Sequence, residues 1–94
     1  FIGSKFYNDR IDSKLDTQEQ VKEKLEKAEN LKELGEHKVV RINKIDGVKL
    51  YFDNGSWILV RPNGTEPLLR IYIECDSLEK LEEFKENIRN ASIA

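Results

Sequence analysis

One stretch of the chain reads Trp57-Ile58-Leu59-Val60-Arg61-Pro62-Asn63-Gly64-Thr65-Glu66-Pro67-Leu68-Leu69-Arg70-Ile71-Tyr72-Ile73. Both of its ends are strongly apolar and rich in β-branched and aromatic residues, which favours a strand on each side. Its centre, residues 61–67, is polar and contains one glycine and two prolines, which is typical of a turn. The stretch therefore predicts two strands of a sheet that are joined by a polar loop at the sheet edge.

The polar loop also concentrates hydrogen-bond donors. Arg61 supplies a planar guanidinium that can bind two oxygens of one anion. Gly64 lacks a Cβ, so the backbone N–H groups around it can approach an anion closely. Asn63 and Thr65 add an amide and a hydroxyl donor, and Arg70 on the following strand adds a second cation. These residue types suit an oxyanion such as phosphate. A hairpin loop with turn chemistry alone is the alternative interpretation.

Two helices are predicted around the strands. The first begins after an N-cap at Asp16 or Thr17 and ends before Gly35. Its apolar residues recur at helical spacing and are Val21, Leu25, Ala28, Leu31 and Leu34. The second begins after Asp76 or Ser77, and its apolar stripe is Leu78, Leu81, Phe84, Ile88 and Ala91. Since each helix has one apolar stripe, we expect both to cover the same face of the sheet.

The remaining strands are predicted at about 5–15, 37–45 and 48–53, with Asp46-Gly47 as a hairpin signal. The expected order is β-α-β-β-β-α, which gives an α+β fold with a four-stranded antiparallel sheet and two helices on one face. The other face is expected to be open or to contact a neighbour, and carries Tyr51, Arg70, Tyr72 and Glu74.

Composition narrows the classes of protein. Ninety-four residues fit a single domain, 1–94. The net charge of -2, with Lys and Arg interleaved with Glu, argues against a nucleic-acid partner.

Cys75 is the only cysteine, so no internal disulfide can form. This fits a cytoplasmic location, and we interpret Cys75 as a core residue. His37, the only histidine, makes a poor metal site. No run approaches the length of apolar sequence that spans a membrane. The start Phe1–Lys5 has no signal-peptide layout, and we expect the chain to be a fragment of a longer protein.

Residues 61–72 closely resemble the phosphate-binding loop of the α-D-phosphohexomutases, which are the phosphoglucomutases, phosphomannomutases and phosphoglucosamine mutases. The usual form of that loop reads Arg-Pro-Ser-Gly-Thr-Glu-Pro, followed by an apolar pair, Arg and an apolar-aromatic strand. The chain departs from it once, since Asn63 stands where the family usually has Ser. The resemblance implies the C-terminal domain of a phosphohexomutase, with a fold similar to that of the TATA-box-binding protein.

The resemblance also implies a role. Arg61, Asn63, Gly64 and Thr65 would contact the phosphate of the sugar substrate that is not being transferred, with Arg70 as charge support. The family's phosphoserine, Mg²⁺-binding aspartates and sugar-recognition loop lie in earlier domains, and none of their motifs is present here. We therefore expect the isolated chain to be inactive. Its implied partners are a phosphosugar and the preceding domains of the same polypeptide. Mg²⁺ would be bound by those missing domains, and a hexose 1,6-bisphosphate would be the intermediate.

The main alternative is a non-catalytic binding module on the same scaffold, because a fold of this kind does not fix function. An RNA-binding version would use exposed aromatic residues on the open sheet face, for which Tyr51 and Tyr72 are the candidates. Glu74 and the acidic charge balance argue against it. A phosphoglucosamine mutase domain is the alternative within the resembled family.

Overall fold

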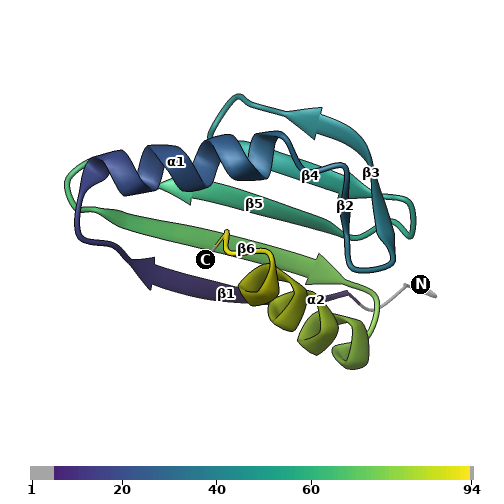
Figure 1. The fold of residues 1–94 in the computed structure, drawn as a ribbon. Coiled ribbons are helices and arrows are strands. Elements are labelled where there is room, and N and C mark those ends of the chain that lie inside the picture. Colours follow the sequence, from purple (N-terminus) through teal and green to yellow (C-terminus); the bar gives the residue numbers. More distant parts are fainter. Residues whose placement is uncertain (1–5, 94) are drawn as a thin grey trace.

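The computed structural model describes residues 6–93 and contains one sheet of six strands with two helices (Figure 1). The strands lie in the order β1-β6-β5-β4-β3-β2, and every neighbouring pair for which a register is defined is antiparallel. The segment Phe1–Lys5, which has no signal-peptide layout, lies outside the described residues, as does the first residue of the strand predicted at about 5–15.

The strands are β1 (Tyr7–Lys14), β2 (Glu33–Leu34), β3 (His37–Asn43), β4 (Val48–Phe52), β5 (Trp57–Pro62) and β6 (Leu68–Cys75). The helices are α1 (Gln18–Glu29) and α2 (Leu78–Asn90).

The predicted α+β class is confirmed, but the predicted four-stranded sheet is wrong in strand number. Five strands, not three, lie between the helices. Each of the four apolar segments between residues 37 and 75 forms a strand of its own. The fifth strand, β2, has only two residues and pairs Leu34 with His37, so it is too short to give a recognisable alternation.

Helix α1 is shorter than the sequence predicted. The helix ends at Asn30. The side-chain amide of Asn30 donates to the carbonyl oxygen of Glu26 at 2.8 Å, and its backbone N–H donates to the carbonyl oxygens of Ala28 and Glu26. Leu34, predicted on the helix, is instead buried in β2. The predicted N-caps are confirmed for both helices: Thr17 Oγ1 accepts from the N–H of Gln20, and Ser77 Oγ accepts from the N–H of Lys80.

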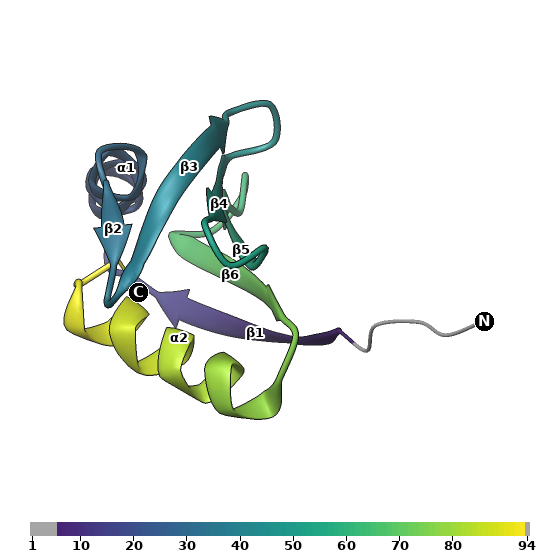
Figure 2. The same cartoon turned by 90° about the vertical axis from the view of Figure 1, so that its right-hand side faces the viewer.

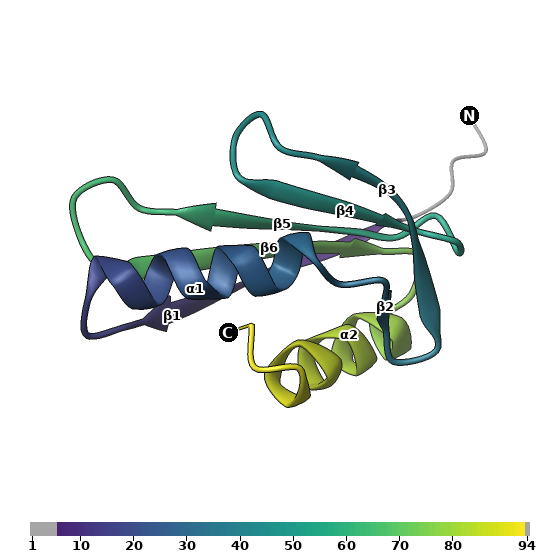
Figure 3. The ribbon, with the colours of Figure 1, turned by 45° about the horizontal axis from the view of Figure 1, so that its top comes forward.

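Both helices pack on one face of the sheet, as expected. Figure 2 shows the sheet curling, and Figure 3 shows the two helices on the same side of it. The strands contribute to the core Val48, Leu50, Phe52, Ile58, Val60, Leu69, Ile71, Ile73 and Cys75. The helices contribute Val21, Ala28, Leu81, Phe84 and Ile88. Alternate residues of β4, β5 and β6 therefore point away from the core and form the uncovered face.

Cys75 is a fully buried core residue, as predicted. Burial raises the pKa of its thiol, which keeps the sulfur protonated and unreactive at neutral pH. Within residues 6–93, neither helix is long and apolar enough to cross a membrane.

Candidate functional site

The polar loop lies where the sequence places it, between β5 and β6, at the end of the sheet next to the connection from β1 to α1 (Figure 1). Three backbone hydrogen bonds anchor it. The N–H of Asn63 donates to Leu68 O at 2.9 Å, the N–H of Leu68 donates to Glu66 O at 2.7 Å, and the N–H of Leu15 donates to Pro67 O at 2.7 Å. Both ends of the loop are thus fixed, and one end is tied to the entry of α1.

Most of the predicted site residues surround one hollow. Its volume is about 230 Å³, and its lining residues are Arg61, Pro62, Asn63, Gly64, Arg70 and Tyr72. Four of the five predicted residues are therefore brought together. Thr65 is not part of this lining. Tyr72, which was placed only on the open face, is an additional lining residue that its position two residues after Arg70 puts on the same face of β6.

Inside the loop, the side chain of Asn63 accepts two hydrogen bonds from Thr65. The backbone N–H and the hydroxyl of Thr65 both donate to Asn63 Oδ1 at 3.1 Å. This is the local hydrogen bonding by which Asn stabilises a turn. Asn63 therefore holds the shape of the loop through its oxygen, while its NH₂ group is the end that can donate to an anion.

Gly64 occupies the tip of the loop without any constraint from the rest of the chain. Its φ is not in the left-handed region, and a Cβ built on it would have no heavy atom within 4 Å. Nothing in the described fold thus requires glycine at this position. The space beside Gly64 is open.

The two arginines of the hollow lie directly opposite each other. Arg61 of β5 pairs with Arg70 of β6 in the antiparallel register, an arrangement in which like charges destabilise the sheet. On the other side of Arg70, Asp12 of β1 is the register partner. Asp12 Oδ1 lies 3.7 Å from Arg70 Nε and 3.2 Å from Arg10 Nε. Sequence reasoning missed Asp12 because only the pairing of β1 with β6 brings it to the site.

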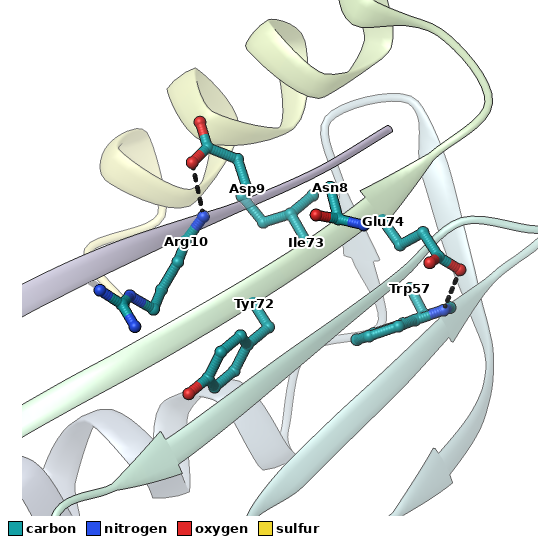
Figure 4. Close-up of a pocket in the computed structure, with 7 residues that line it drawn as sticks. All are labelled: Asn8, Asp9, Arg10, Trp57, Tyr72, Ile73 and Glu74. Carbon is teal, nitrogen blue, oxygen red and sulfur yellow. Dashed lines mark hydrogen bonds between the residues drawn. The ribbon is translucent and has the colours of Figure 1, made fainter. Parts of the chain in front are cut away.

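A second, shallower hollow of about 470 Å³ lies further along the open face (Figure 4). Tyr72 lines both hollows. Trp57 is held in place here, since its indole N–H donates to Glu74 Oε2 at 2.9 Å and Lys49 Nζ lies 4.1 Å from its ring centroid. Asp9 forms an ion pair with Lys85 of α2, and the hydrogen bond from Lys85 lowers the pKa of the Asp9 carboxyl. Trp57 is thus the ring that polar partners from the same sheet hold on the open face.

Within residues 6–93, no group of three or more His, Cys, Asp or Glu side chains is arranged to hold a metal ion. These residues do not fit the Mg²⁺ that the resembled family uses. The groups that line the hollow are two guanidinium groups, a side-chain amide, the ring of Tyr72 and backbone.

Fold and site define an α+β domain with an arginine-containing loop at one end of its sheet. Residues 14–91 match the family model described as "Phosphoglucomutase/phosphomannomutase, C-terminal domain". The chain belongs to this family, and the resemblance inferred from residues 61–72 is confirmed.

Individual relatives agree with this assignment. The chain is 52% identical over 48 residues to a probable phosphoglucosamine mutase of Methanothermobacter thermautotrophicus, a match that covers 51% of the chain and 11% of the relative. It is 50% identical over 54 residues to a phosphoglucomutase/phosphomannomutase of Thermococcus kodakarensis, covering 57% of the chain and 12% of the relative. A phosphomannomutase of Methanocaldococcus jannaschii is 36% identical over 61 residues, covering 64% and 13%. The match thus spans only a small part of each relative's length.

Proposed function

We propose that this chain grips the non-transferred phosphate of the substrate in a phosphohexomutase. The enzyme would interconvert a hexose 1-phosphate and a hexose 6-phosphate through a phosphoserine and a bisphosphate intermediate. Family membership supports the reaction class. The observation that carries the site is the single hollow of about 230 Å³ that Arg61, Asn63, Gly64 and Arg70 line together.

The electrostatics of the hollow favour a doubly charged anion. Arg61 and Arg70 face each other across neighbouring strands, so each raises the energy of the other until an anion lies between them. A phosphomonoester carries a charge of about -1.5 to -2 at neutral pH and offers three acceptor oxygens. Each hydrogen bond from a guanidinium to such an oxygen contributes about 1.5–3 kcal/mol. Arg61 and Arg70 can therefore supply most of the binding free energy in this fragment.

The loop is shaped before the ligand arrives. The hydrogen bonds from Thr65 to Asn63 and the backbone bonds at both loop ends fix the turn, so little conformational entropy is lost on binding. Thr65 joins the phosphate contacts in this proposal only if its side chain changes rotamer and gives up its hydroxyl hydrogen bond to Asn63, since it does not line the hollow as described. Asn63 then takes the place of the usual Ser, with its NH₂ group as donor.

The remaining parts of the reaction belong to other domains of the same polypeptide, in the cytoplasm. The phosphoserine and the Mg²⁺ site are proposed to lie there, and the chain would act by closing over the phosphosugar, which excludes water. Because the loop contacts phosphate and not the sugar ring, the proposal covers glucose, mannose and glucosamine phosphates alike. The isolated chain is expected to show no mutase turnover with glucose 1-phosphate in a coupled assay, and turnover would contradict the proposed division of labour.

Thermal unfolding in phosphate tests the proposed site. A ligand that binds the folded state at about 100 times its Kd raises the free energy of unfolding by about 2.7 kcal/mol. The wild-type chain should unfold at a higher temperature in about 100 mM phosphate than in chloride of equal ionic strength, given a Kd of about 1 mM. Arg61→Ala should remove this difference without lowering stability in chloride.

The matched control is Arg41→Ala. Arg41 lies on β3 over the ring of Tyr51, 5.2 Å from its centroid, and does not line the hollow. This variant should keep the full phosphate effect. Since general salt effects act equally on both variants, an equal response of Arg61→Ala and Arg41→Ala would exclude the loop as the phosphate site.

A further inference from the structure

Three charged side chains form a row across neighbouring strands at the mouth of the hollow. Asp12 of β1 pairs with Arg70 of β6, and Arg70 pairs with Arg61 of β5. In this row one negative side chain, Asp12, is followed by two positive ones, Arg70 and Arg61. Arg70, in the middle, has a carboxylate on one side and a second guanidinium on the other, and its orientation depends on both.

The Nε atom of Arg70 is buried although the rest of the side chain is partly exposed. This atom is shielded from solvent and has no hydrogen-bond partner among the described residues. The nearest acidic atom is Asp12 Oδ1 at 3.7 Å, which is within ion-pair range but too long for a hydrogen bond. A buried donor without a partner costs free energy, so a small shift that closes this distance is favoured.

We propose that Asp12 is a positioning residue for the phosphate site. Its carboxylate holds the Nε edge of Arg70, so that the outer edge of the guanidinium faces the hollow beside Arg61. This inference rests on the proposed phosphate-binding function and adds a residue that lies outside the loop motif.

The charge count at the site supports this arrangement. Asp12 Oδ1 also lies 3.2 Å from Arg10 Nε, so the carboxylate forms ion pairs with both Arg10 and Arg70. Because Arg10 offsets the charge of Asp12, the two arginines that line the hollow, Arg61 and Arg70, keep two positive charges, which is the charge that a phosphate dianion neutralises. Asp12 is thus compatible with anion binding although it is itself negative.

Positioning and simple charge repulsion predict opposite effects of removing the carboxylate charge. If Asp12 only repelled the anion, Asp12→Asn would strengthen phosphate binding. If Asp12 positions Arg70, Asp12→Asn weakens binding, since Arg70 then turns away from Arg61. The sign of the change therefore separates the two roles, and denaturant unfolding of Asp12→Asn without phosphate checks that the variant is fully folded in the titration.

The test is an amide chemical-shift titration of the 94-residue chain with inorganic phosphate. Asp12→Asn should weaken phosphate binding by about three- to tenfold, the effect of losing the alignment of one charge-assisted bond. In an Arg70→Ala background the same change should no longer weaken binding, because the group that Asp12 orients is gone. Unchanged or tighter binding in Asp12→Asn would overturn the inference. Arg61→Ala reports separately on the phosphate site itself.

A second readout does not depend on phosphate. The side-chain Nε–H resonance of Arg70 should exchange slowly with water and shift on Asp12→Asn, while that of Arg41, on the same sheet, should stay in place. An Arg70 Nε–H resonance that is indifferent to Asp12→Asn would show that the two side chains do not interact, whatever the outcome of the titration.

Discussion

Two turns at the same end of the sheet contain a glycine for opposite reasons. Gly47 connects β3 to β4, has φ +134°, and a Cβ on it would lie 2.4 Å from Val60 O and 3.2 Å from Arg61 Cα. Gly64 connects β5 to β6, has no left-handed φ, and its Cβ would meet nothing within 4 Å. The fold itself explains Gly47. It leaves Gly64 unexplained, and a bound anion would explain it.

The two turns are also physically connected. Gly47 allows the β3–β4 turn to pack directly against the backbone of Val60 and Arg61, where β5 leads into the polar loop. The first turn therefore supports the strand end from which the Arg61 side chain projects. Because only Gly47 is constrained by the fold, substitutions at the first turn are expected to act mainly on stability and those at Gly64 mainly on ligand binding.

The largest effect is expected at the first turn. Gly47→Ala should lower the free energy of unfolding by about 2–4 kcal/mol, because it combines a strained φ with a clash against backbone. The measurement is denaturant unfolding. Gly55→Ala is the matched control, since Gly55 has φ +87° but open space around its Cβ; it should cost only about 1 kcal/mol. Equal losses in both variants would mean that the contact with β5 is unimportant.

The second turn should respond in binding and not in stability. Gly64→Ala should leave the free energy of unfolding unchanged or raise it by about 0.5 kcal/mol, because alanine restricts the unfolded chain. Its phosphate affinity should fall by about tenfold, since a methyl group blocks the approach of the anion to the backbone. Chemical-shift titration and denaturant unfolding of the same variant measure both quantities. A loss of stability with intact affinity would reverse the comparison.

A smaller effect is expected at Asn63. Asn63→Ala removes the acceptor for two hydrogen bonds from Thr65 and should weaken phosphate binding by about threefold to tenfold through a looser loop. Asn63→Ser keeps an oxygen that can accept from the N–H of Thr65, as in the turns that Ser forms. Its affinity should stay within about twofold of the wild type. If Ala and Ser behave alike, the hydrogen bonds to Thr65 do not matter for binding.

The sequence predicted those parts of the molecule that depend on local pattern. The two N-caps, the apolar alternation of β4 to β6 and the loop between β5 and β6 are all local signals, and the structure has them. It failed where a distant partner decides. Leu34 has helical spacing but lies in β2, because Asn30 ends α1 and His37 offers a strand to pair with. The strand β2 was missed for the same reason, whereas the other strand missing from the count, one of the four between residues 37 and 75, was already visible as an apolar segment of its own.

The candidate site shows the same division. Arg61, Asn63 and Gly64 lie within four residues of sequence, so their meeting around one hollow follows from the hairpin. Asp12 reaches Arg70 only because β1 pairs with β6 at the edge of the sheet. No spacing rule could predict that pair, since it joins segments from opposite ends of the chain.

The most direct test of the central claim, that the β5–β6 loop binds phosphate, is an amide chemical-shift titration of the wild-type chain. The ligands are inorganic phosphate, glucose 1-phosphate and glucose 1,6-bisphosphate, with an expected Kd of about 1 mM, or about -4 kcal/mol. We predict saturable shifts confined to the amides of Arg61, Asn63, Gly64, Thr65 and Arg70 with all three ligands. Absence of shifts there at about 50 mM ligand, some 50 times the expected Kd, would contradict the claim.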